Sequence, residues 1–377
     1  MLDNISNIIN IITIFQLSIL AYVLISSKNK QQANKFLFTF LIVNILLVIV
    51  YRLYAYNIIP LNFRLFIYTE MSAFLLLGPL IYLYTKSICY SDFKFNKIYW
   101  LHFSGFFLAF IFLWMEYFVR VSNASDAENI VTVTKFSYTI YSIFFFSQLL
   151  TYIILSFITL YKYRKKIKTE FSSVENMDLS WLNILLVVYF FHWLFDTLIF
   201  VFYISDVKSP ELYSILGIFS ILTLLFFSTW AVVKGLKQLS VFSGIKQKEK
   251  YADSQLSKSE SEMFVTELIS YMETSKPYLE PSLKIIELAK NLSIPAKSLS
   301  QSINQQLGKN FFDFINSYRI EEAKKQIVKS SNNGKTILEI LYDSGFNSKA
   351  AFNRAFKKHT GTTPSEFKRS YLRNSSK

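Results

Sequence analysis

The segment that follows Gly345 combines an apolar helix face with a face of basic and amide side chains. A helix is expected to begin near Ser348, because apolar residues then recur at spacings of three and four. The apolar face holds Phe352, Ala355, Phe356 and His359. The opposite face holds Lys349, Ala350, Asn353, Arg354 and Lys357. Ammonium, guanidinium and amide groups are those that bind phosphates and base edges, so this face predicts contact with a nucleic acid.

A second polar face is expected about fifty residues earlier. Pro295 suits the start of a helix over residues 296–307, and Gly308 suits its end. This helix should bury Leu299 and Ile303. It should expose Lys297, Ser298, Ser300, Gln301, Asn304 and Gln305. Gln301, Asn353 and Arg354 are the predicted base-contacting side chains. The predicted phosphate contacts are Lys297, Lys349, Lys357 and Lys358.

The elements that position these two faces are short helices with recognisable ends. Asn310 caps a long helix over residues 311–329, and Ser348 caps the helix of the second face. Capping boxes begin at Thr336 and Thr363. The pattern predicts two helix-turn-helix units joined by one long helix. Residues 278–377 contain 17 Lys and Arg against 8 Asp and Glu, and this excess of positive charge favours DNA as the partner.

Residues 278–377 resemble the DNA-binding domain of AraC/XylS-type transcription regulators. The residues that carry the resemblance are Leu288-Ala289, Leu292, Leu299-Ser300-Gln301, Gly308, Asn310-Phe311, Tyr318-Arg319-Ile320, Ala323, Gly345-Phe346, Phe352, Arg354, Phe356-Lys357 and the run from Gly361 to Phe367. The resemblance implies two recognition helices in successive major grooves of double-stranded DNA. It also implies base contacts by Ser300, Gln301, Lys349, Asn353 and Arg354. Lys284, Pro295 and Gln301 depart from the residues that are usual in the family.

The first two-thirds of the chain is far more apolar. The chain is 52% hydrophobic, and apolar runs of about 20 residues can cross a bilayer. Seven such runs are predicted, over Ile5–Ser26, Phe36–Tyr56, Phe66–Tyr84, Ile98–Tyr117, Phe136–Tyr161, Leu179–Ile204 and Leu212–Val233. Lysines and arginines are concentrated in alternate loops, most densely between Lys162 and Lys168. This distribution predicts an N-terminus outside the cell and a C-terminal part in the cytoplasm.

Ionisable residues within the predicted spans are costly, which makes them candidates for a sensor site. Glu70 lies in the third span, and His192 and Asp196 share a face of the sixth. One hypothesis is a pocket that senses a small molecule, a proton or a membrane signal. The alternative is an interior polar contact that only fixes helix packing.

Between the two parts, residues 234–277 are predicted to form a juxtamembrane linker. A capping box at Ser259 and Glu262 should start a helix there. Its apolar stripe of Met263, Phe264, Leu268 and Tyr271 would either form a homodimer or dock on the following domain. One cysteine, three dispersed histidines and no phosphate-binding glycine motif predict no metal, no cofactor and no enzyme.

The fold class expected from the sequence is all-α: a seven-helix transmembrane bundle over residues 1–233, the linker over 234–277 and a double helix-turn-helix domain over 278–377. The expected function is that of a transcription regulator in the bacterial cytoplasmic membrane, whose spans control DNA binding. The alternative is a seven-span transporter or receptor with a basic cytoplasmic tail that binds lipid or protein.

Overall fold

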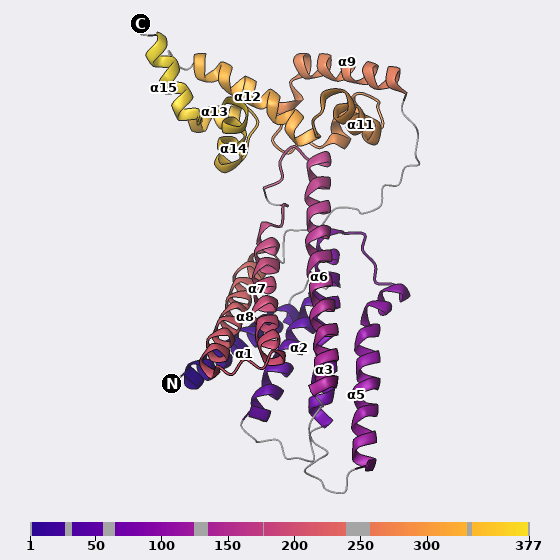
Figure 1. The fold of residues 1–377 in the computed structure, drawn as a ribbon. Helices are drawn as coiled ribbons and strands as arrows, with labels where there is room; N and C mark the ends of the chain where they lie inside the picture. Colours follow the sequence, from indigo (N-terminus) through magenta and orange to yellow (C-terminus); the bar gives the residue numbers. More distant parts are fainter. Residues whose placement is uncertain are drawn as a thin grey trace. The chain divides into compact units, whose positions relative to one another are not determined.

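The computed structural model describes residues 2–26, 32–55, 65–123, 135–175, 177–238, 257–329 and 334–375 (Figure 1). The described residues are helical apart from turns and one isolated antiparallel bridge between Phe171 and Lys284, which confirms the predicted all-α class. The chain forms two compact units. The first comprises Met1–Tyr161 and Leu179–Lys248, and the second comprises Lys162–Asp178 and Glu249–Lys377.

The first unit contains the predicted apolar helices. They are α1 (Leu2–Ser26), α2 (Gln32–Ala55), α3 (Leu65–Phe74), α4 (Leu77–Cys89), the 3₁₀ helix η2 (Lys97–Phe103), α5 (Ser104–Asn123), α6 (Lys135–Glu170, whose last residues belong to the second unit), α7 (Ser180–Ile204) and α8 (Pro210–Gln238). Within the part of the chain that the structure describes, seven segments are long and apolar enough to cross a membrane. This number agrees with the sequence prediction, and α3 and α4 together form the third segment.

The third segment is interrupted at Leu75 and Leu76, where the chain makes a turn between α3 and α4. Pro79 provides the reason, because its ring clashes with the carbonyl of the residue four positions earlier and it has no N–H to donate. The break between α3 and α4 thus lies just before Gly78-Pro79, where a proline within a span favours a kink. Gly78 also lies against Tyr152 of α6: a Cβ atom at Gly78 would be 2.7 Å from the Tyr152 ring.

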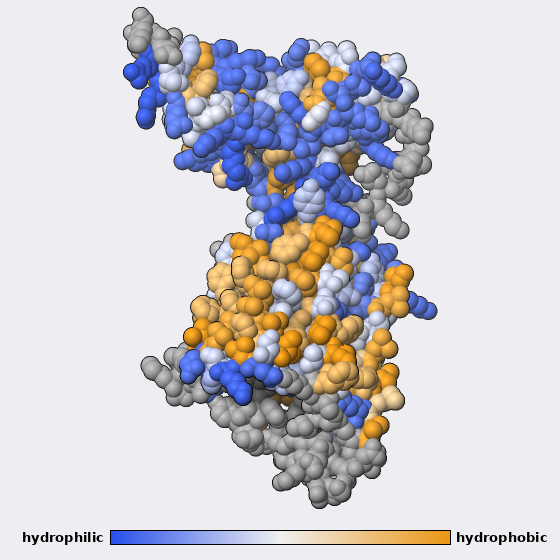
Figure 2. All heavy atoms as spheres, in the orientation of Figure 1, coloured by the Kyte–Doolittle hydropathy of each residue, from blue (hydrophilic) through white to orange (hydrophobic). Residues whose placement is uncertain are grey.

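Many large apolar side chains of the first unit face outward rather than into its core. Ile11, Leu108 and Phe136 are among the exposed ones. Figure 2 shows hydrophobic residues gathered over the helices of this unit, whereas the surface of the second unit is largely hydrophilic. An apolar outer surface of this extent suits contact with lipid and would be costly in water.

The second unit contains shorter, amphipathic helices. They are α9 (Lys258–Ser275), the 3₁₀ helix η4 (Pro277–Leu279), α10 (Ile285–Asn291), α11 (Ala296–Leu307), α12 (Phe311–Lys329), α13 (Ile337–Asp343), α14 (Lys349–Thr360) and α15 (Pro364–Ser375). The pairs α10–α11 and α13–α14 are each joined by a tight turn. We call them the first and second helix pairs. Helix α12 connects them (Figure 1).

Helix α9 packs on the first helix pair through Leu268 of the predicted stripe, with Phe264 and Tyr271 partly buried against the same core, whereas Met263 is exposed. Val265, Leu268 and Met272 are buried, and α9 contacts α11. The predicted start of this helix was wrong by two residues. Its capping box joins Ser257 to Glu260, and not Ser259 to Glu262. Both Ser-x-x-Glu patterns occur in the sequence, so the local pattern alone could not choose between them.

Candidate nucleic-acid interface

Helix α11 is held by its apolar face and presents a mainly polar one. Leu299 and Ile303 are fully buried, as expected. Gly308 ends the helix in the left-handed conformation, with φ of 62°, and its N–H donates to the Asn304 carbonyl over 3.0 Å. The predicted contact residues differ in exposure: Asn304 is exposed, and Lys297, Ser300 and Gln301 are half-buried. Ser298, which was predicted to be exposed, is buried, because it lies on the side of α11 that faces the core.

Helix α14 has the predicted separation of faces more clearly. Phe352 and Phe356 are fully buried, and Ser348 accepts a hydrogen bond from the Ala351 N–H over 3.3 Å. The predicted contact residues lie on the outer side: Lys349, Ala350, Arg354 and Lys357 are exposed, and Asn353 is half-buried. His359 was assigned to the apolar face, but it is exposed near the end of α14. The structure therefore leaves the polar face of α14 largely open over about two and a half turns.

Each helix pair has a core of its own, and α12 contributes to both. Phe311, Phe314 and Ile315 belong to the core of the first pair. Ile320, Ala323 and Ile327 belong to the core of the second. Asn310 caps α12 by accepting from the Asp313 N–H over 2.9 Å. One continuous helix thus connects α11 to α14, an arrangement that suits binding at two points along a duplex.

Between the two cores lies Arg319, which is 1% exposed. Its Nε donates to the Tyr278 carbonyl over 2.7 Å, and its Nη2 donates to the Glu280 carbonyl over 2.7 Å. Its Cζ also lies 5.6 Å from the centre of the Phe346 ring. Burial lowers the pKa of the Arg319 guanidinium to about 10, and the carboxylates of Glu175 and Glu280 oppose this shift, so the group is charged at neutral pH.

Gly345 brings the turn of the second helix pair directly against the same backbone. Its φ is 85°, and a Cβ atom there would overlap the Tyr278 carbonyl oxygen and lie 2.9 Å from the Leu279 Cα. The Tyr278 carbonyl is therefore contacted by Arg319 from one side and by the Gly345 turn from another. These contacts join the two helix pairs at α12.

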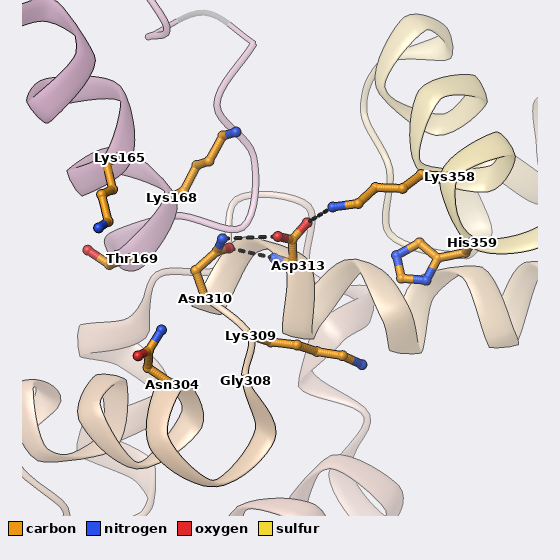
Figure 3. Close-up of a pocket in the computed structure, with 10 residues that line it drawn as sticks. All are labelled: Lys165, Lys168, Thr169, Asn304, Gly308, Lys309, Asn310, Asp313, Lys358 and His359. Carbon is orange, nitrogen blue, oxygen red and sulfur yellow. Dashed lines mark hydrogen bonds and ion pairs between the residues drawn. The ribbon is translucent and has the colours of Figure 1, made fainter.

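A basic cavity of about 390 Å³ opens between α11 and α14 (Figure 3). Its lining residues are Lys165, Lys168, Thr169, Asn304, Gly308, Lys309, Asn310, Asp313, Lys358 and His359. Lys358 donates to the Asp313 carboxylate over 2.7 Å, which ties the end of α14 to the start of α12. Lys358 is also a predicted phosphate contact, and its side chain stays largely exposed in this ion pair.

The candidate sensor residues lie in two places in the first unit: His192 and Asp196 on α7, and Glu70 on α3. His192 and Asp196 of α7 are in contact, with 3.6 Å between Nε2 and Oδ2. Ser220 of α8, which the sequence did not single out, donates to Asp196 Oδ1 over 2.6 Å and lies 2.9 Å from His192 Nδ1. Glu70 lies on α3, which packs against α2 and α5, whereas α7 packs against α8.

Comparison with known proteins finds a family model that matches part of the second unit. Residues 288–370 match the family model described as a helix-turn-helix domain. An uncharacterized HTH-type transcriptional regulator of Staphylococcus aureus strain COL is 31% identical over 104 residues, which are 28% of this chain. This chain covers 13% of the length of that relative. Another such regulator, from Pseudoalteromonas carrageenovora, is 32% identical over 89 residues, which are 24% of this chain and 51% of the relative.

Two solved structures are also similar in sequence. The C-terminal domain of AraT, a response regulator from Geobacillus stearothermophilus, is 26% identical and matches 31% of this chain and 88% of its own, with a TM-score of 0.26. A Listeria innocua protein is 28% identical and matches 28% of this chain and 94% of its own, with a TM-score of 0.25. The family match confirms the helix-turn-helix part of the predicted resemblance over residues 288–370, and both relatives that match this region are named as transcriptional regulators.

Proposed function

We propose that this protein is a membrane-bound, one-component transcription regulator. Its seven apolar segments form a transmembrane sensor, and its two helix pairs are helix-turn-helix units that bind promoter DNA. The observation that carries the proposal is the pair of polar faces on α11 and α14, set on the single helix α12 within a region that matches a helix-turn-helix family. Two such faces can enter successive major grooves, where each base pair presents a distinct pattern of donors and acceptors.

The distribution of positive charge supports the proposed location, the bacterial cytoplasmic membrane. Lys28, Lys30 and Lys35 lie between the first two spans, and five Lys and Arg lie between Lys162 and Lys168. The loops on the other side carry fewer. The chain crosses the bilayer seven times. By the positive-inside rule, its N-terminus is outside and its DNA-binding part is in the cytoplasm. DNA must then be bound close to the membrane surface.

The test is selection of DNA from a random pool by the full-length protein in nanodiscs. We expect enrichment of one sequence family, and affinity for it that falls as salt rises, with a slope of about 0.9 per neutralised phosphate. Binding without sequence preference would contradict the proposal. It would favour the alternative, a transporter or receptor whose basic tail binds lipid or protein.

Arg354→Ala should weaken binding of the selected DNA by about 1–3 kcal/mol and relax the preference at one base position. The reason is that Arg354 is exposed at the middle of the polar face of α14, where a guanidinium can donate two parallel hydrogen bonds to guanine. The measurement is a binding titration against a library with every single-base change.

Lys357→Ala is the matched control, because Lys357 lies three residues after Arg354 on the same exposed face of α14. It should weaken all sequences about equally and reduce the salt slope by about one unit, as expected for a phosphate contact. Uniform weakening by Arg354→Ala as well would place Arg354 at a phosphate and not at a base.

Signal detection is assigned to the polar group of His192, Asp196 and Ser220, with Glu70 as a second candidate. Asp196→Asn keeps the size of the side chain but removes its charge. Glu70→Gln does the same on α3. If these groups respond to a proton or a ligand, each substitution should change signal-dependent transcription of a target promoter by at least about fivefold, the lower end of typical allosteric coupling.

Ser228→Ala provides the control for helix packing. Ser228 of α8 donates to Gln16 of α1 over 2.7 Å, so the substitution removes a comparable contact between helices without a titratable group. It should leave the response unchanged. If neither Asp196→Asn nor Glu70→Gln alters the signal or pH response, these residues serve packing only.

A further inference from the structure

The segment Lys162–Asp178 includes the last residues of the fifth apolar segment, Phe136–Glu170, and leads along the chain to the sixth, yet it belongs to the second compact unit. Its first nine residues continue α6 as helix to Glu170. Tyr163 and Ile167 are buried. The Tyr163 hydroxyl donates to the Met177 carbonyl over 2.5 Å, so the two ends of the segment are in contact. We refer to Lys162–Asp178 as the docking segment.

Ser172 is the centre of its contact with the first helix pair. Its N–H and its hydroxyl both donate to the Leu283 carbonyl, over 3.1 Å and 2.7 Å. The adjacent Phe171 forms the antiparallel bridge with Lys284. Ser172 is 1% exposed, so these hydrogen bonds are made away from water, where unpaired groups are costly.

Arg319 connects the docking segment to α12. Its Nη1 donates to the Ser172 carbonyl over 3.2 Å, and its Nη2 donates to the Ser172 hydroxyl over 3.1 Å. Without Ser172, the nearest other acceptor for Nη1 among the described residues is Asn316 Oδ1, at 3.5 Å. Because a buried guanidinium that loses its acceptors is costly, the conformation of α12 at Arg319 and the docking of Ser172 are energetically linked.

The docking segment also contacts the second helix pair. The Ser173 hydroxyl lies 3.3 Å from Asn347 Oδ1, directly before the cap of α14. Lys165, Lys168 and Thr169 line the basic cavity together with Asn304 of α11 and His359 of α14 (Figure 3). One short segment therefore reaches the start of the first helix pair, the connecting helix, and the turn that begins the second recognition face.

We propose that Lys162–Asp178 docks on the DNA-binding unit through Ser172 and Arg319, and that this contact sets the separation of α11 and α14. Since the chain runs from this segment directly into the fifth and sixth apolar segments, a change in the sensor reaches the DNA-binding unit through this contact, in addition to the covalent linker. This inference rests on the proposed function for its consequence, but the docking itself does not depend on DNA.

Docking is tested by a disulfide trap in membrane vesicles that contain the full-length protein. Cys89, the single cysteine, is replaced by Ala, and Phe171→Cys is combined with Lys284→Cys. Residues paired across an antiparallel bridge have Cα atoms about 4.5–5.5 Å apart, which is within the range of a disulfide. We expect an intrachain disulfide to form at least about tenfold faster than in the control pair Phe171→Cys with Lys290→Cys, because docking raises the effective concentration of the first pair.

Ser172→Trp should abolish this difference, since an indole does not fit the buried site. Ser172→Ala removes the hydroxyl alone and should reduce the difference less. Equal rates for the two cysteine pairs, or a disulfide only between two copies of the chain, would overturn the docking.

The consequence is measured with the selected DNA and with a truncated DNA that keeps one half of the site. Ser172→Trp should weaken binding of the full site by about tenfold and leave the half site unchanged, because only binding at two points depends on the separation of α11 and α14. Unchanged or tighter binding of the full site would overturn the link between docking and separation. If the unmodified protein selects no DNA sequence, the proposed function fails, while the disulfide trap still decides whether the segment docks.

Discussion

Gly345→Ala is expected to separate the two helix pairs and to abolish sequence-specific DNA binding. A Cβ atom there would overlap the Tyr278 carbonyl oxygen and the Leu279 Cα. Both are backbone atoms, so no side-chain rotation can relieve the overlap. The left-handed φ of 85° adds about 1–2 kcal/mol of strain for a residue with a side chain, and the overlap adds about 1–3 kcal/mol. We therefore expect a loss of about 2–5 kcal/mol in the local opening free energy of α13 and α14. Native-state hydrogen exchange of the full-length protein measures this quantity.

Gly361→Ala is the matched control. Its φ is 79°, similar to that of Gly345, but a Cβ atom there would meet nothing within 4 Å. It should therefore cost only the strain, about 1–2 kcal/mol, and leave DNA binding intact. Equal losses for the two substitutions would show that the contact between Gly345 and Tyr278 contributes nothing.

Arg319→Met is expected to have the second large effect, about 3–5 kcal/mol of opening free energy across α10–α14. Methionine fills much of the volume but donates no hydrogen bond. The carbonyls of Tyr278 and Ser172 would lose a buried donor, and each such loss costs about 1–3 kcal/mol. The Glu280 carbonyl would lose a partly buried one. Hydrogen exchange should show the loss in both helix pairs, since Arg319 lies between their cores.

Lys324→Met on the same helix separates this effect from the mere loss of a positive charge. Lys324 is partly exposed and pairs with Glu321 over 2.9 Å. A surface pair of this kind contributes up to about 1 kcal/mol, so the substitution should change opening by no more than that. If Arg319→Met costs as little as Lys324→Met, the Arg319 hydrogen bonds do not hold the unit together.

Features that depend on neighbours in sequence could be predicted well. The capping boxes at Thr336 and Thr363 and the cap at Ser348 are present, because each uses residues within three positions of one another. The pairing of His192 with Asp196 likewise follows from a spacing of four on one helix. Ser220 completes that group from α8 and could not be found from the sequence, because helix packing alone brings it there.

Arg319 shows where sequence reasoning stopped. The sequence held a signal, since Ile315, Arg319 and Ala323 recur at a spacing of four and place an arginine within the core stripe of α12. Its partners carried no signal, because most are backbone carbonyls, which any residue provides. Ser172 lies 147 positions away along the chain, in a loop predicted only to be basic. The other long-range contacts of Lys162–Asp178 carry no signal in the sequence either. These residues were therefore predicted to belong to the membrane part, whereas the structure includes them in the second unit.

Helices α11 and α14 present different side chains from within one chain: Ser300, Gln301 and Asn304 on the first, and Lys349, Asn353 and Arg354 on the second. Under the proposed function, a single copy would therefore recognise two unlike half-sites in a fixed order. The operator would be a directional sequence and not a palindrome. Inverting it would reverse the polarity of the bound protein relative to the start of transcription, and the same sequence in the opposite orientation would present a different surface to RNA polymerase.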